Sequence, residues 1–203
     1  MQQVKSFIKE FLEIAIISLI VVLPIRYYVA QPFLVSGASM DNTFHNGNYL
    51  IIDEISYRFQ EPKRGDVVIL KVPPKGLELQ HVDQSKTVFY IKRIIGLPGE
   101  TVSVNGDEIK ISKTATSSGT VLSEPYIYID KNIQSSFSNI KVNVSLGEGE
   151  YFVMGDNRHN SSDSRLWGGL NKSNIRGRVF LRLFPVNKIS LFTGEYNSYD
   201  LIK

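Results

Sequence analysis

The chain has 203 residues, enough for one domain with a proper core and too few for two large ones. Its 23 basic and 20 acidic side chains leave a net charge of only +3, and no stripe of Lys and Arg interleaves with aromatic residues, so nucleic-acid binding is not predicted. The absence of cysteine excludes disulfides, thiolate metal sites and a cysteine nucleophile, and it leaves the compartment open.

An apolar stretch at residues 11–30 is the first strong signal along the chain. A helix needs about 20 such residues to cross a bilayer. The two charges in the stretch, Glu13 and Arg26, lie near its ends, where long side chains can reach the interface. A cleaved secretory signal is the alternative, but Tyr28 stands where the cleavage pattern requires a small residue. An uncleaved span is therefore favoured.

The basic residues before this stretch bear on its orientation. Lys5 and Lys9 favour a cytoplasmic N-terminus. We therefore expect residues 1–10 to be cytoplasmic and residues 11–30 to form a single-pass transmembrane anchor in the cell membrane. Residues 31–203 would then form a domain on the extracytoplasmic side.

Beyond residue 32 the pattern changes to short β-like runs separated by Gly, Pro and Asn. The part of the chain after this residue is therefore predicted to be mostly β, with no helix after the anchor. We expect strands at residues 49–52, 67–71, 88–95, 101–104, 108–111, 140–144, 151–154 and 178–183.

Three further features describe the connections between these strands. Asn105-Gly106 is typical of a two-residue hairpin turn, which needs positive backbone angles. Residues 73–86 and 112–138 are expected to be loops, since they are rich in turn-forming residues. The second loop belongs to a predicted loop region or small hairpin lobe at about residues 105–145 of the same domain.

A serine among small residues closely follows the apolar stretch. Ser39 lies in the segment Ser36-Gly37-Ala38-Ser39. At a chain bend, such a serine can expose its hydroxyl and place backbone N–H groups beside it, as acyl transfer requires. Taken alone, the same composition also fits an ordinary loop.

A serine nucleophile needs a base, and histidine is the usual one. His45 is close to Ser39 in sequence, His81 lies in a polar loop, and His159 lies in a turn. No nucleophile-elbow sequence accompanies them, so a Ser-His-Asp triad stays open without being favoured.

Lys92 is the other candidate base. Strict alternation along its strand places it on a face with Val88, Tyr90 and Ile94, and places Arg93 on the opposite face, where it remains charged. Apolar neighbours disfavour the ammonium form, and a base acting near neutrality needs its pKa lowered by roughly 2 to 3 units from about 10.4. The alternative is a lysine that reaches the surface or pairs with a carboxylate.

The polar segment at residues 155–165 follows a predicted strand and is rich in groups that hold turns. Within it, Asp163 and Arg165 can pair. An acidic calcium-type loop or a solvated turn is the alternative, but two carboxylates beside two arginines neutralise a hard cation poorly. We expect a rigid polar scaffold beside a site, and neither a metal nor another cofactor.

Together these segments resemble the type I signal peptidases, the bacterial leader peptidase family, from the apolar stretch to about residue 179. Four boxes occur in the family's order, which makes them specific as a set: Ser39-Met40-x-x-Thr43, residues 64–68, residues 90–100 and residues 155–165. The resemblance implies a membrane-bound serine endopeptidase that removes N-terminal signal peptides from exported preproteins after small residues in an Ala-x-Ala pattern.

The resemblance also implies roles for individual residues. Ser39 would attack the scissile carbonyl, and Lys92 would take its proton and later protonate the leaving amine. Ser161 would hydrogen-bond the lysine amine, and Asp163 and Arg165 would form a supporting ion pair.

The oxyanion hole would include the backbone N–H of Ser39. Gly37 occupies a place where some members have a serine donor, so a second N–H, a water or Ser36 must substitute. Asn42 stands where proline is usual, which predicts a less rigid turn after the nucleophile. Glu100 replaces an aspartate outside the proposed chemistry.

Exported preproteins and the lipid bilayer are the partners that the resemblance implies, with the protein translocation machinery as a further one. Two other functions remain open. A self-cleaving serine-lysine regulator would carry a DNA-binding segment in place of the apolar span. A non-catalytic, membrane-tethered binding module would share the fold, but the retention of Ser39, Lys92 and Ser161 argues against it.

Overall fold

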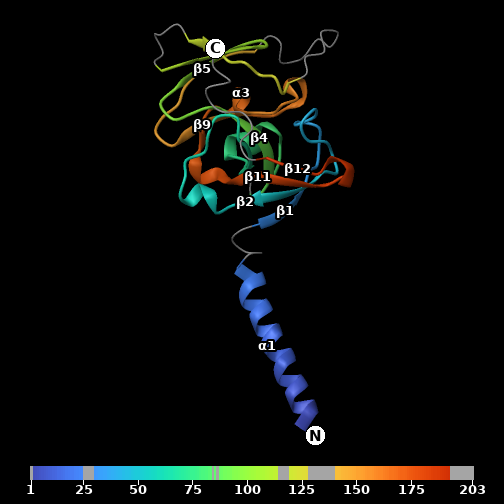
Figure 1. Ribbon diagram of the computed structural model, residues 1–203. Coiled ribbons are helices and arrows are strands. Elements are labelled where there is room, and N and C mark those ends of the chain that lie inside the picture. The colour runs from blue at the N-terminus through green and yellow to red at the C-terminus, as the bar shows by residue number, and fades with distance from the viewer. Residues whose placement is uncertain are drawn as a thin grey trace.

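The computed structural model describes residues 2–24, 30–83, 85, 87–113, 119–127 and 140–192. An N-terminal helix, α1 (Gln2–Pro24), precedes strands that form two antiparallel sheets, and it extends away from them (Figure 1). The prediction of a mostly β fold is confirmed.

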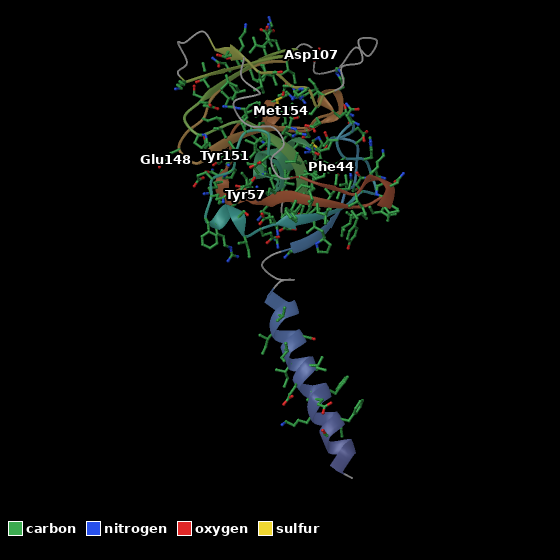
Figure 2. All side chains as sticks on the ribbon, in the orientation of Figure 1. Phe44, Tyr57, Asp107, Glu148, Tyr151 and Met154 are labelled. Atoms are coloured by element: carbon green, nitrogen blue, oxygen red, sulfur yellow. The ribbon has the colours of Figure 1, made fainter. Side chains whose placement is uncertain are left out.

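Side chains project on all sides of α1 with no strand beside them, and residues 6–21 are exposed (Figure 2). Among the described residues, however, no helix has both the length and the apolar character needed to cross a membrane. Four charged residues lie in α1: Lys5, Lys9, Glu10 and Glu13. Residues 25–29 of the expected span lie outside the described residues. The structure therefore does not support the transmembrane helix expected at residues 11–30.

The larger sheet has eight strands, and the lysine-bearing strand β4 lies in its interior, hydrogen-bonded to a neighbour on each side. Residues 91–96 of β4 are all buried, because other parts of the domain cover both faces of the strand. In spatial order the strands are β1 (Ala30–Leu34), β2 (Tyr49–Asp53), β11 (Ile175–Phe184), β3 (Val67–Lys71), β4 (Phe89–Gly96), β9 (Glu150–Met154) and β10 (Leu170–Asn171), with β12 (Ser190–Leu191) paired to β11.

Strand β1 was not predicted. Proline cannot donate to a sheet ladder, and Pro32 lies in the middle of this strand. The sheet tolerates Pro32 because β1 is an edge strand that pairs with β2 alone. This pairing places the end of β1 directly before the Ser39 segment.

A second, four-stranded sheet has the order β7-β6-β5-β8. Its strands are β7 (Thr120–Val121), β6 (Glu108–Ser112), β5 (Thr101–Asn105) and β8 (Lys141–Ser145). The predicted hairpin is confirmed, but Asn105 pairs with Glu108, so the two turn residues are Gly106 and Asp107. Gly106 has the positive φ, 61°, that such a turn requires.

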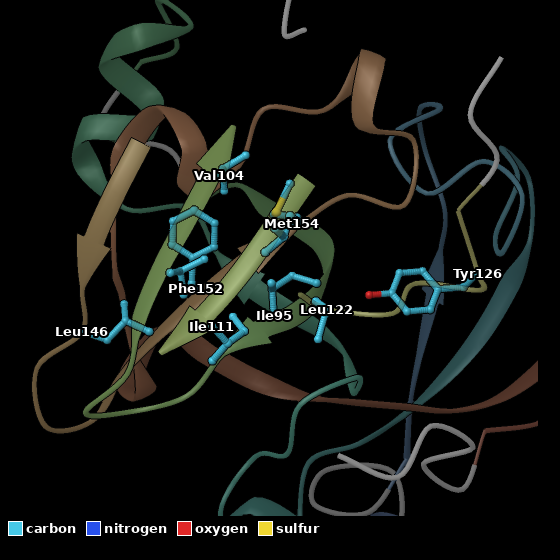
Figure 3. Packing of buried hydrophobic residues seen from close by; sticks show 10 residues of the cluster. Ile95, Val104, Ile111, Leu122, Tyr126, Leu146, Phe152 and Met154 are labelled. Carbon is cyan, nitrogen blue, oxygen red and sulfur yellow. The ribbon is translucent and has the colours of Figure 1, made fainter. Parts of the chain in front are cut away.

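One hydrophobic cluster joins the two sheets (Figure 3). Ile95 of β4 and Phe152 and Met154 of β9 lie in the same cluster as residues from the second sheet, among them Val104 and Ile111. The shared core fixes the second sheet against β4, which carries Lys92, and against β9, which leads into the polar segment.

The expectation of no helix after residue 30 was wrong. Helix α2 (Pro74–Leu79) lies in the predicted loop at residues 73–86, and α3 (Ser164–Trp167) lies in the polar segment. Both are too short to show a helical period in the sequence. Pro74 suits the first turn of α2, where a missing N–H is tolerated, and Asp163 caps α3 by accepting from the N–H of Arg165.

Short 3-10 turns complete the described chain. They are η2 (Ser56–Arg58), η3 (Arg158–Asn160), η4 (Lys172–Asn174) and η5 (Val186–Lys188). Of these, η3 belongs to the segment that faces Ser39, because its N-cap Asn157 binds the backbone there.

Candidate active site

The structure brings Ser39 and Lys92 together from positions 53 residues apart in the chain. Ser39 lies in a turn after β1, and Lys92 lies in the middle of β4. The Nζ of Lys92 is 2.8 Å from the Oγ of Ser39. Among the described residues, Lys92 is the only side chain hydrogen-bonded to this hydroxyl.

The surroundings of Lys92 favour its neutral amine. Its side chain is only 2% exposed, and its Nζ also donates to the carbonyl of Ile91 at 2.9 Å. Burial lowers the pKa of Lys92 from 10.5 to about 8, against the opposing effect of the carboxylates of Asp163 and Asp156. The amine can therefore accept and return a proton near neutral pH.

The histidines do not replace Lys92 as partners of Ser39. His45 contacts Asp41 through Nδ1 at 3.1 Å, His81 is exposed, and both ring nitrogens of His159 lack a hydrogen-bond partner. The arrangement required for a Ser-His-Asp triad is thus not present among the described residues.

Asn157 holds the chain at the nucleophile. Its backbone N–H donates to the carbonyl of Ser39 at 3.1 Å, and its side-chain amide donates to the carbonyl of Ala38 at 3.0 Å. The sequence placed Asn157 within the polar segment but gave no reason to single it out. Asn157 binds backbone carbonyls, and such contacts produce no recognisable pattern of residue types or spacing in the sequence.

The expected ion pair between Asp163 and Arg165 forms. Two hydrogen bonds of 2.8 and 2.9 Å run from the guanidinium of Arg165 to the carboxylate of Asp163, which also accepts from the N–H of Gly155 at 3.1 Å. Ser161 is 3% exposed, but its hydroxyl makes no hydrogen bond to any described residue. The hydrogen bond from Ser161 to the lysine amine that the resemblance implied is therefore not observed.

Gly155 explains why the polar segment lies so close to the serine. A Cβ added to Gly155 would lie 2.3 Å from the Oγ of Ser161 and 2.4 Å from the carbonyl oxygen of Ser39. Only a glycine allows this approach. Ser161 and Ser39 are thus packed against the same backbone position.

Arg93, expected on the face opposite Lys92 and charged, is buried in a polar network. Its guanidinium donates to both carboxylate oxygens of Asp156, at 2.8 and 2.6 Å, and to the carbonyl of Gly65 at 2.8 Å. Thr43 donates to the same Asp156 carboxylate at 2.5 Å. The network connects the nucleophile box, the lysine strand and the polar segment, and the sequence did not predict it.

Three residues depart from the family pattern, and the structure shows the backbone angle or the hydrogen bonds of each. Gly37 has a φ of 101° and donates its N–H to the side chain of Asn46 at 3.1 Å. Asn42 has a φ of 86°, which asparagine tolerates and proline cannot adopt. Glu100 accepts from Arg64 at 2.6 Å and from the N–H of Leu97 at 2.8 Å, away from Ser39.

A pocket of about 300 Å³ opens at Ser39 and Lys92. Phe33, Ile69 and Phe89 contribute apolar surface to its lining. Gln80, Asn160 and Ser162 contribute polar groups, and Ser36 also borders the space. A peptide segment with small side chains could lie here with a carbonyl group beside the serine hydroxyl.

A serine hydroxyl in contact with a buried amine of lowered pKa, beside an open pocket in a β-rich domain, is the arrangement of a serine hydrolase. Comparisons with known proteins identify the family within this class. The family model described as "Signal peptidase, peptidase S26" matches residues 8–184. The chain belongs to this signal peptidase family and is a serine endopeptidase with signal peptidase I function.

Two relatives agree with this assignment. The chain is 36% identical to "Probable signal peptidase I-1" of Synechocystis sp., over 97% of this chain and 91% of that protein. It is also 36% identical to "Signal peptidase I" of Bacillus licheniformis, over 91% of this chain and 93% of that protein. The crystal structure of a signal peptidase I from Enterococcus faecalis V583 is 30% identical, covers 59% of this chain and 97% of its own, and gives a TM-score of 0.43.

Proposed function

We propose that this signal peptidase cuts preproteins through an acyl-enzyme, with Ser39 as nucleophile and Lys92 as general base. The observation that supports this proposal is the 2.8 Å contact between Nζ and Oγ. Burial lowers the pKa of Lys92 to about 8, so a substantial fraction of the amine is neutral near pH 7 to 8.

In the proposed reaction, Lys92 takes the hydroxyl proton of Ser39 while Oγ attacks the scissile carbonyl carbon. The backbone N–H of Ser39 stabilises the oxyanion, and Ser36 at the pocket rim is a candidate second donor. The lysine ammonium then protonates the leaving amine as the peptide bond breaks. A water, deprotonated by Lys92, hydrolyses the ester and restores the Ser39 hydroxyl.

Ser161, Asp163 and Arg165 would support this pair without touching the substrate. The Asp163–Arg165 ion pair holds the N–H of Gly155, and Gly155 packs against both Ser39 and Ser161. The carboxylate of Asp163 also limits how far burial lowers the pKa of Lys92. The three residues would therefore set the position and the basicity of the amine.

The pocket of about 300 Å³ supports a preference for small side chains, in an Ala-x-Ala pattern before the cut. Exported preproteins carrying signal peptides would be the substrates. No cofactor or metal enters the proposed steps.

Exposed apolar surface supports action at a membrane. On α1, Phe7 and Phe11 are 70% and 65% exposed. On the sheet domain, Leu34 and Val186 are 61% and 73% exposed. Burying such surface in lipid is favourable, so we propose that α1 and the adjoining residues attach the enzyme to the cell membrane, with the domain at residues 31–203 on the extracytoplasmic side near the translocation machinery.

Cleavage of a preprotein with an Ala-x-Ala site tests the reaction. Wild-type protein in detergent micelles is expected to cut after the second alanine, and Ser39→Ala and Lys92→Met are expected to be inactive while folded. A Lys92→Met protein that cleaves normally would remove Lys92 from the mechanism. A folded but inert wild type would contradict the proposed reaction.

Vesicle flotation tests the membrane proposal separately. The full chain is expected to float with vesicles, and a chain lacking residues 1–24 is expected to float less. Protease protection of residues 31–203 inside sealed inverted vesicles would support the proposed orientation. Their digestion in intact inverted vesicles would contradict it.

A further inference from the structure

We propose that Gln80, which lies outside the four boxes, limits the size of the side chain that the catalytic pocket accepts. Gln80 would do so by holding Tyr90 and Ser162 in one wall of the pocket. All three residues line this pocket. The inference rests on the proposed function, because it concerns the choice of substrate at that site.

The side-chain amide of Gln80 bridges two of the functional boxes. Its Oε1 accepts from the hydroxyl of Tyr90 at 2.5 Å, and its Nε2 donates to the Oγ of Ser162 at 2.9 Å. The same Nε2 donates to the carbonyl of Gly76 at 3.1 Å. Tyr90 belongs to the lysine strand and Ser162 to the polar segment, so the hydrogen bonds of Gln80 connect these two elements.

Tyr90 transmits this restraint toward the reacting groups. It lies two residues before Lys92 on β4, and the Nζ of Lys92 is 4.9 Å from the centre of its ring. The ring centre is also 6.4 Å from that of Trp167. The ring thus borders the pocket beside the amine, and its hydroxyl is tied at the far end to Gln80.

The backbone of Gln80 is itself well supported. Gln80 is the C-cap of α2, and Leu77 of that helix is 4% exposed. A Cβ added to Gly76 would lie 2.9 Å from the ring of Trp167, so α2 packs closely on α3. A short, firmly packed helix therefore presents an amide that both accepts and donates. Apolar side chains lack this combination, and asparagine offers it on a side chain one methylene shorter.

Removing this amide should let the pocket accept larger side chains and should have a smaller effect on the rate of cleavage. Without Gln80 the Tyr90 hydroxyl loses its acceptor, and the ring gains freedom to turn away from the pocket. Larger side chains before the scissile bond would then fit better, whereas Ser39 and Lys92 keep their direct contact. Gln80 is in this sense a positioning residue for specificity.

The experiment compares peptide substrates that carry Ala or Leu at the first or the third position before the cut. The measured quantity is the ratio of kcat/KM for Leu to kcat/KM for Ala. Gln80→Ala and Tyr90→Phe are each expected to raise this ratio at one position on the order of 10-fold. The double variant is expected to raise it no further, because both changes remove one restraint.

Gln60→Ala is the matched control, since Gln60 is exposed, and it should leave the ratio unchanged. A general loss of structure lowers kcat/KM for both peptides equally and does not move the ratio. If Gln80→Ala does not fold, Tyr90→Phe tests the same hydrogen bond with less disturbance. An unchanged ratio in folded variants overturns the proposal.

A binding measurement separates this outcome from failure of the proposed function. If the wild type cuts neither peptide, the proposed reaction fails. The dissociation constants of the same peptides are then compared, and a shift of the Leu-to-Ala ratio in Gln80→Ala still supports the role of Gln80 in the pocket. The absence of that shift contradicts it.

Discussion

The side-chain amide of Asn157 donates to the carbonyl of Ala38 at 3.0 Å, directly before the candidate nucleophile. Replacing Asn157 by Ala removes this bond and keeps the backbone hydrogen bond from residue 157 to the carbonyl of Ser39. One neutral hydrogen bond is worth about 1 kcal/mol, so we expect kcat to fall about 5-fold to 10-fold with little change in KM. Steady-state kinetics on a cleavable peptide measures the effect. A loss confined to KM would contradict a positioning role.

The activity should depend on pH through Lys92. Since the pKa of Lys92 is lowered to about 8, the neutral base disappears as pH falls below that value. We expect kcat/KM to decrease about 10-fold per pH unit on the acid side. A profile of kcat/KM against pH measures this limb. A flat profile between about pH 6 and about pH 9 would exclude Lys92 as the base.

Lys92→Met should stabilise the protein while abolishing activity. The lysine pKa is about 8 when folded and 10.5 as the ordinary value, so the unfolded chain holds more protons between these two values and stability rises with pH across that window. Below about pH 8 the full cost of burial applies, on the order of 3 kcal/mol. Methionine carries no charge and has a similar volume, so the variant avoids this cost without a cavity.

Urea unfolding at pH 7 and at about pH 10 measures this gain. We expect a higher midpoint for Lys92→Met at pH 7 and a smaller difference at the higher pH. An equal midpoint for variant and wild type at pH 7 would show that burying the amine costs little.

Gly155→Ala should damage both stability and activity. The added methyl group would overlap the carbonyl oxygen of Ser39 and the hydroxyl of Ser161, and overpacking of this kind costs about 1 to 3 kcal/mol. Gly147→Ala is the control, because its nearest neighbour is the flexible end of Glu150 at 3.3 Å. Thermal unfolding and peptide cleavage are compared for both variants. Comparable effects of the two changes would refute the close packing at Gly155.

Asn42→Pro tests the turn after the nucleophile. Proline is fixed near a φ of about −65°, and Asn42 has a φ of 86°, so we expect a loss of more than about 1 kcal/mol and reduced cleavage. Asn42→Gly should keep both near wild type, since glycine adopts positive φ freely. A proline variant that is more stable than the wild type would show that this turn can take the conformation usual in the family.

The sequence predicted the parts of the site that depend on residue type and order. Ser39 and Lys92 are each ordinary when taken alone, and the order of the four boxes singled them out; the structure places them in contact. Alternation did not reveal that Arg93 is buried, because β4 is buried on both faces and Arg93 pairs with Asp156, 63 residues away along the chain. An ion pair between residues so far apart in the chain produces no local pattern in the sequence.

Gln80 and Asn157 were missed for a different reason. Both act through contacts to backbone groups or to single hydroxyls, and both lie in segments whose composition is typical of loops. Helix α2, which positions Gln80, has six residues and no detectable period. Such residues become visible only when the tertiary structure is known.

The two reacting groups differ in how firmly the fold holds them. Lys92 lies on an interior strand hydrogen-bonded on both sides, whereas Ser39 lies in a turn outside the sheet, held by a few hydrogen bonds, the packing at Gly155 and the buried side chain of Met40. Amide hydrogen exchange should therefore be slow throughout β4 and faster around Ser39. Any opening of the catalytic pair would then begin at the serine, which moves toward or away from an amine that stays in place.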